Sequence, residues 1–282
     1  MHQPSRRTFL VAAAAATGAT YFDLPQLAGA QAASGSFPIG LQSYTLRKFP
    51  VEKALEIIRN DLKLHYVELY PEHFRMEPAP GHVTSMLKRL KALDLTWNAH
   101  GVNAFGKDAD LNRKIFAVAR AAGIANLSAD PEPESFASLE QLVTEFGIRI
   151  AIHNHGPGSR YEKIADVVKA VKGRHPMIGA CIDTGHFIRS AEDPVKAARE
   201  LQGRVFGVHL KDFAEQKANA ADIVLGKGHL DVAAFLKALR ETKFPADGSL
   251  SIEFEGSPDN PVAEVQACVA AVNDAIARIG AG

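Results

Sequence analysis

Short apolar segments alternate with longer amphipathic segments along most of the chain. The apolar segments predict eight strands, at residues 39–44, 65–70, 95–101, 124–129, 148–154, 178–184, 205–211 and 250–255. The segments between and after them have helical spacing of apolar residues, and they lie at 51–63, 83–93, 111–122, 136–146, 162–172, 195–202, 232–242 and 262–279. Strand–helix units in this succession indicate an α/β protein, a (β/α)8 TIM barrel.

Polar side chains gather at the C-terminal ends of the predicted strands. Side chains two residues apart on a strand point the same way, so the polar series faces the barrel interior and the apolar series faces the helices. Of the 11 histidines, those at or just beyond strand ends are His100, His153, His155, His186 and His209. A single histidine there is as often a hydrogen-bonded structural residue. Five of them on four strands predict one shared site at the rim where barrel active sites form.

Four of these polar residues are metal-ligand types, one from each of the last four strands. They are His153, Asp183, His209 and Glu253. Imidazole and carboxylate ligands together suit Mn²⁺, Co²⁺, Zn²⁺ or Fe²⁺, and the share of carboxylates also allows Mg²⁺. A cation held there can polarise a carbonyl or hydroxyl oxygen and stabilise an enediolate. The sequence therefore predicts a divalent-metal site.

Six short motifs resemble those of the xylose isomerase-like TIM barrels, the sugar phosphate isomerase/epimerase superfamily. They are V-E-L-Y at 67–70, H-N-H-G at 153–156, I-D-T-G-H at 182–186, V-H-L-K-D at 208–212, L-G-K-G at 225–228 and S-I-E-F-E at 251–255. The resemblance covers residues 38–279. It implies a divalent cation, with Mn²⁺ as the first expectation, held by Asp183, His209 and Glu253, and it implies that His186 contacts the substrate or the ligands.

The strand-five position departs from that family pattern. In the family, a strand-five glutamate binds the metal and exchanges protons with the sugar together with the strand-eight glutamate. Here His153 stands where many relatives have glutamate. A metal-bound imidazole is a poor replacement for a carboxylate base, so the second proton-transfer group stays open among Glu68, His155, Lys211 and Glu255.

The expected function is a divalent-metal-dependent sugar isomerase or epimerase that removes a proton next to a carbonyl, with Glu253 as one base. The alternatives are a 3-keto-glycoside lyase using the same enediolate chemistry, a metal-dependent hydrolase and a non-catalytic sugar-binding barrel. Besides Glu253, the predicted catalytic residues are Glu68, His155 and Lys211. The predicted substrate contacts are His186, His100, Tyr44 and Glu255.

Charge and the N-terminus add the remaining expectations. The 32 Lys+Arg and 32 Asp+Glu balance, which gives no electrostatic footprint for nucleic acid and leaves a small sugar or keto-sugar as the expected partner. Paired arginines at 6–7, an alanine-rich stretch and an A-x-A site ending at residue 30 predict a twin-arginine signal over 1–30 and a periplasmic barrel domain over 31–282. This leader is too short and too weakly apolar for a stable membrane span. Cys181 and Cys268 are expected to be buried thiols.

Overall fold

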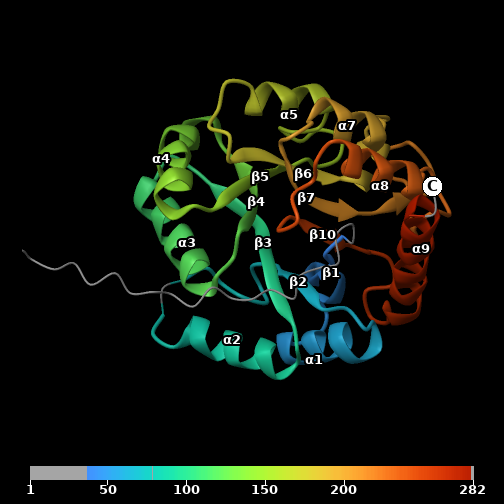
Figure 1. Ribbon diagram of the computed structural model, residues 1–282, viewed down its shortest axis with the longest axis horizontal. Helices are drawn as coiled ribbons and strands as arrows, with labels where there is room; N and C mark the ends of the chain where they lie inside the picture. Colours follow the sequence, from blue (N-terminus) through green and yellow to red (C-terminus); the bar gives the residue numbers. More distant parts are fainter. Residues whose placement is uncertain (1–36, 78, 281–282) are drawn as a thin grey trace, which may run out of the picture. The chain divides into compact units, whose positions relative to one another are not determined.

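The strands close into one parallel barrel, as Figure 1 shows, which confirms the predicted fold. The computed structural model describes residues 37–77 and 79–280, so the predicted leader lies outside the described residues. Around the barrel the strands follow the order β1-β10-β7-β6-β5-β4-β3-β2. Their bounds are β1 Ile39–Gln42, β2 Tyr66–Leu69, β3 Thr96–Phe105, β4 Asn126–Pro131, β5 Arg149–His153, β6 Ile178–Asp183, β7 Val205–Leu210 and β10 Ser249–Ile252.

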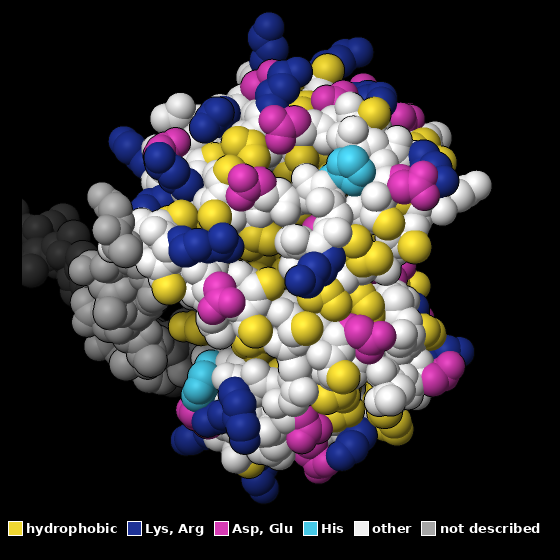
Figure 2. All heavy atoms as spheres, turned by 90° about the vertical axis from the view of Figure 1, so that its right-hand side faces the viewer, with side chains coloured by type: hydrophobic (Ala, Val, Ile, Leu, Met, Phe, Trp, Pro, Cys, Tyr) yellow, Lys and Arg dark blue, Asp and Glu magenta, His cyan; other side chains and the backbone are white. Residues whose placement is uncertain are grey.

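Helices cover the outside of this barrel (Figure 1). Their bounds are α1 Val51–Glu56, α2 His82–Ala92, α3 Ala109–Ala122, α4 Phe136–Phe146, α5 Ile164–Val171, α6 Thr184–Arg189, α7 Pro194–Glu200, α8 Val232–Glu241 and α9 Val262–Gly280. Side-chain caps set several helix starts: the Asp108 side chain accepts hydrogen bonds from the first turn of α3, and that of Asp231 does so for α8. On the face in Figure 2, basic and acidic side chains are interspersed, in keeping with the balanced charge.

The predicted alternation of side chains is confirmed on β1, β2 and β7 but not at His100 on β3, where a register shift between β2 and β3 pairs His100 with Leu69 of the hydrophobic core. Leu41, Val67 and Val208 are buried within the large hydrophobic core cluster that the strands share with the helices. Polar partners instead meet across the barrel: Ser128 on β4 and Ser251 on β10 both donate to Glu68 on β2. Because β2 is not adjacent to either of these strands, the contacts run through the barrel interior. The interior is therefore polar well below the rim.

The long connection between β7 and α8 is folded around one carboxylate. Asp212 accepts hydrogen bonds from the backbone N–H groups of Gly226, Gly228 and Leu230, each at 2.9 Å. Gly226 has a φ of +77°, and a Cβ on Gly228 would meet the carbonyl oxygen of Phe213 at 2.2 Å. The L-G-K-G motif thus supplies the glycines whose backbone surrounds this carboxylate.

Two further expectations have a structural outcome. Cys181 and Cys268 are both free and buried, as predicted. Within 37–77 and 79–280, no helix combines the length and the apolar character needed to cross a bilayer.

Candidate metal and substrate site

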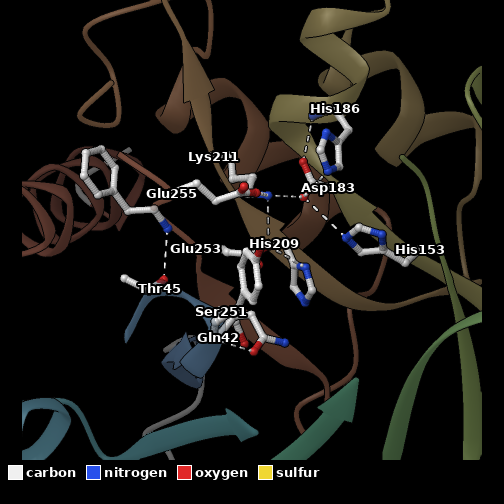
Figure 3. Close-up of polar contacts among 12 residues, drawn as sticks. Gln42, Thr45, His153, Asp183, His186, His209, Lys211, Ser251, Glu253 and Glu255 are labelled. Carbon is white, nitrogen blue, oxygen red and sulfur yellow. Dashed lines mark hydrogen bonds and ion pairs between the residues drawn. The ribbon is translucent and has the colours of Figure 1, made fainter. Parts of the chain in front are cut away.

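The structure brings the four predicted metal ligands together at the C-terminal end of the barrel. His153 ends β5, Asp183 ends β6, His209 lies on β7 and Glu253 directly follows β10. Each offers one nitrogen or oxygen, and these atoms all lie within 4.8 Å of one another. All four side chains are buried, and they are turned toward one another in Figure 3.

The unpaired atoms of this cluster fit a divalent cation. Both ring nitrogens of His153 and of His209 and Oδ2 of Asp183 are buried and form no hydrogen bond of regular geometry, although Nδ1 of His209 lies 3.0 Å from Oε2 of Glu253 and Oδ2 of Asp183 lies 3.3 Å from Nζ of Lys211. Buried polar atoms in folded proteins are nearly always paired, so a converging set without such hydrogen bonds indicates a missing ligand. Two imidazoles and two carboxylates suit several divalent transition metals and do not select one of them. This cluster could hold the predicted metal.

Asp183 is fixed so that one of its oxygens faces the cluster. Its Oδ1 accepts a 2.7 Å hydrogen bond from the N–H of His186 and thereby caps α6. The Asn154 side chain holds the backbone of Asp183 from both sides, accepting from its N–H and donating to its carbonyl, each at 2.9 Å. The predicted strand 178–184 therefore ends one residue early, and α6 begins at once. Asn154, between the two histidines of H-N-H-G, was missed because its side chain acts on backbone groups.

Lys211 is enclosed by carboxylates next to this cluster. Its side chain is 1% exposed, and its Nζ lies 3.3 Å from Oδ2 of Asp183 and 3.1 Å from Oε2 of Glu253. Nζ also forms an ion pair with Glu255. Burial alone would lower the pKa of Lys211, but Asp183, Glu253 and Glu255 together raise it well above its usual value. Lys211 is therefore a buried ammonium ion with three negative neighbours.

A cavity of about 390 Å³ opens above the cluster. It is lined by Gln42, Tyr44, Tyr70, Pro71, Gly101, Val102, His153, His155, His186, Lys211, Glu253 and Glu255. Three predicted catalytic residues (His155, Lys211, Glu253) and three predicted substrate contacts (Tyr44, His186, Glu255) thus face one space. Gln42 and Tyr70 line the same space, and the predicted alternation places them on the strand faces of Tyr44 and Glu68. The predicted roles of these residues stay predictions.

Glu68 and His100 do not line this cavity. Both are completely buried. Glu68 lies inside the barrel with its oxygens engaged by Ser128 and Ser251. The ring of His100 contacts the carbonyl oxygen of Phe74 at 2.8 Å through Nε2 and lies 3.0 Å from Oδ1 of Asn103 through Nδ1. The predicted proton exchange by Glu68 and the predicted substrate contact by His100 find no support in this placement, because other protein groups occupy their polar atoms.

Burial favours the neutral form of His155 and His186, two of the three histidines in the cavity lining. Burial is the largest cause that lowers the pKa of His155, to about 4, and the neighbouring His153 adds to it. Burial likewise lowers the pKa of His186, to about 3, against the opposing effect of Asp183. The rings lie 5.4 Å apart between centroids. Near neutral pH they can therefore offer hydrogen bonds to hydroxyl groups without adding positive charge.

Asp222→Asn is expected to stabilise the protein increasingly as the pH rises. Oδ2 of Asp222 accepts a 2.7 Å hydrogen bond from the N–H of Glu255, whereas Oδ1 is buried without a partner. Burial raises the pKa of Asp222 from 3.8 to about 7. A raised carboxyl pKa means that ionisation between these two values destabilises the folded state. Asparagine keeps the acceptor and avoids this cost.

The measurement is the difference in melting temperature between Asp222→Asn and the unchanged protein at several pH values. The difference should be smallest below pH 4, grow between pH 4 and pH 7, and level off above. A difference that does not change with pH would contradict the prediction.

Comparisons with known proteins agree with this architecture. A family model described as xylose isomerase-like TIM barrel matches residues 132–271. An inosose dehydratase of Clostridium botulinum (strain Alaska E43 / Type E3) is 30% identical over 118 residues, which span 42% of this chain and 37% of that relative. The chain thus matches little more than a third of the length of this curated relative.

Solved structures cover nearly the whole barrel. An uncharacterised protein from Parabacteroides distasonis is 27% identical, with a TM-score of 0.66 over 84% of this chain and 98% of that one. A xylose isomerase domain protein from Planctomyces limnophilus superposes with a TM-score of 0.70 at 17% identity, over 87% of this chain and 99% of that one, which shows a common fold. Over residues 132–271 the chain thus matches the xylose isomerase-like TIM barrel family, and it shares its fold with the solved structures.

Proposed function

We propose that the protein is a divalent-metal-dependent lyase that removes a proton next to the carbonyl of a keto-sugar, keto-cyclitol or oxidised glycoside and expels a β-substituent. The observation that carries this proposal is the imidazole of His153 in the metal-ligand cluster, at the strand-five position. In an isomerase of this family, a strand-five glutamate and a strand-eight glutamate both exchange protons with the sugar. Here the strand-eight position is the carboxylate of Glu253 and the strand-five position is the imidazole of His153. This pair favours elimination, which needs a single base. The match to inosose dehydratase, a dehydratase by name, supports the same choice.

The bound cation would polarise the substrate carbonyl and stabilise the negative charge of the enediolate. Glu253 is the base, because it lines the cavity and stays ionised. Burial alone would raise the pKa of Glu253, but Lys211 and His209 lower it. Glu253 takes the proton from carbon, and the resulting electron pair forms the carbon–carbon double bond.

Lys211 is the acid that protonates the leaving oxygen. It is the cationic side chain of the cavity lining, and its ammonium group holds the proton that departing hydroxide or alkoxide needs. The carbon–oxygen bond breaks as this oxygen accepts the proton and leaves as water or alcohol. Nζ of Lys211 lies 3.1 Å from Oε2 of Glu253, so the proton on Glu253 can return to Lys211 directly. Both groups then regain their starting charge.

The cavity favours an uncharged substrate. Among its lining residues in the described part of the chain, the only lysine or arginine is Lys211, which already contacts three carboxylates. A phosphate or carboxylate on the substrate would have no free cationic side chain in that lining to pair with. A volume of about 390 Å³ is at the small end of the range for small-molecule sites and suits a single hydroxylated ring.

An isomerase or epimerase is the second candidate function. Glu255 lines the same cavity and pairs with Lys211, so a second carboxylate is near the base that removes the proton. If Glu255 and Lys211 return the proton to carbon faster than the β-substituent leaves, the product is an isomer. The two candidates share their first step and differ in the product.

Proton NMR in D₂O separates these functions. The protein is loaded with Mn²⁺ and incubated with neutral keto-sugars, keto-cyclitols and 3-keto-glycosides, and the samples are treated with chelator before spectra are recorded. A lyase gives loss of the α-proton together with an unsaturated ketone. An isomerase gives deuterium at carbon in an intact sugar. Binding without exchange or turnover would contradict the proposal and favour the sugar-binding alternative, whereas hydrolysis products would favour the hydrolase.

A further inference from the structure

The buried carboxylate of Glu68 connects four strands below the metal-ligand cluster. Its Oε1 accepts a 2.6 Å hydrogen bond from the hydroxyl of Ser128 on β4, and its Oε2 accepts a 3.0 Å hydrogen bond from the hydroxyl of Ser251 on β10. Oε2 also lies 3.1 Å from Nε2 of His209 on β7. A buried carboxylate is costly unless other groups compensate it. Two hydroxyl donors and one imidazole fulfil that requirement here.

His209 is thereby held between two carboxylates. Its Nδ1 lies 3.0 Å from Oε2 of Glu253, on the side of the cluster, while Nε2 faces Glu68 on the opposite side of the ring. An imidazole that binds a metal through one nitrogen carries its proton on the other, and a carboxylate facing that proton fixes the ring and makes it a better ligand. The ring orientation of His209 thus places Nδ1 as the ligand atom and Nε2 as the proton-bearing atom.

We propose that Glu68 is a positioning residue that holds His209 with Nδ1 toward the metal and raises the affinity of the site for a divalent cation. Glu68 does not touch the substrate, because it lies outside the cavity lining. This inference rests on the metal binding that the proposed function requires, and it assigns to Glu68 a part in that binding instead of in proton transfer.

The competing explanation is that Glu68 only braces the barrel. Glu68→Gln separates the two explanations, because glutamine keeps the size of the side chain and can still accept from His209 while it removes the negative charge. Ser128→Ala is the matched control. It deletes the hydrogen bond to Oε1 and leaves Oε2, the oxygen near His209, unchanged. A bracing role predicts that both variants lose stability and that neither loses metal affinity.

The experiment measures the Kd of Mn²⁺ for the unchanged protein and both variants by isothermal titration without substrate. Glu68→Gln should bind about 10- to 100-fold more weakly. Ser128→Ala should stay within about threefold, since the charge is kept. Equal Kd values for Glu68→Gln and the unchanged protein would overturn the inference. At saturating Mn²⁺, Glu68→Gln should regain most of its turnover, whereas a variant that has lost its base would not.

A second measurement uses the unchanged protein and so does not depend on the folding of a variant. Proton–nitrogen correlation spectra of the Zn²⁺-loaded protein report which ring nitrogen of His209 carries hydrogen. We expect hydrogen on Nε2, and hydrogen on Nδ1 would refute the assignment. If the unchanged protein binds no divalent cation, the proposed function and this inference both fail. If it binds Mn²⁺ without acting on keto-sugars, only the proposed function fails.

Discussion

Glu253→Gln is expected to lower turnover of a keto-sugar substrate by about a thousandfold while the fold stays intact. The carboxylate of Glu253 contributes to the metal-ligand cluster and also lines the cavity, so it is placed to take the proton from the substrate. A carboxamide has nearly the same shape but cannot accept that proton. The measurement is kcat at saturating Mn²⁺, so that weakened metal binding is not mistaken for lost catalysis.

Glu255→Gln is the matched control for this variant. Glu255 lies two residues farther along, lines the same cavity and pairs with Lys211, but it is not part of the metal-ligand cluster. Its loss should lower kcat much less if the lyase proposal holds. An effect as large as that of Glu253→Gln would favour the isomerase, in which Glu255 takes part in proton return. Full activity of Glu253→Gln would remove Glu253 from the mechanism altogether.

The sequence predicts the metal-ligand cluster well because its members lie at strand ends. The C-terminal ends of parallel strands meet at one rim, so His153, Asp183 and Glu253 must come close whatever the exact stagger of the strands. Periodicity also predicts correctly that Glu68 points into the barrel. Periodicity does not give how far below the rim a side chain lies. That distance depends on the stagger between strands and hence on the whole closed sheet.

Glu68 and His100 therefore lie away from the cavity for two different reasons, depth for Glu68 and strand register for His100. Glu68 lies opposite Gln42 and Ala99 in the register of the neighbouring strands, and its oxygens meet hydroxyls on strands that are not adjacent to it. His100 pairs with Leu69 and Leu127, which belong to the hydrophobic core, because a register shift between β2 and β3 changes the face to which its side chain points. β3 also extends to Phe105, past the predicted end near residue 101. The end of a strand determines which side chains reach the rim. Apolar spacing alone did not reveal that β3 continues.

Lys211→Met is expected to destabilise the metal-free protein by about 3 to 5 kcal/mol, the cost of removing one partner from a buried ion pair. The ammonium group of Lys211 contacts Asp183, Glu253 and Glu255, and methionine would leave these carboxylates together without it. A divalent cation bound to Asp183 and Glu253 would supply positive charge in its place. Saturating Mn²⁺ should therefore stabilise Lys211→Met more than it stabilises the unchanged protein.

The measurement is urea unfolding with chelator and with Mn²⁺, and Lys227→Met is the matched control. Lys227 lies in the same β7–α8 connection and is exposed, so its replacement should change neither the unfolding free energy nor its response to metal. Unchanged stability of metal-free Lys211→Met would contradict the prediction. Turnover decides the second role of Lys211: if Mn²⁺ restores stability and turnover together, Lys211 is only a counter-ion. If stability returns and turnover does not, the ammonium group is also needed to protonate the leaving oxygen.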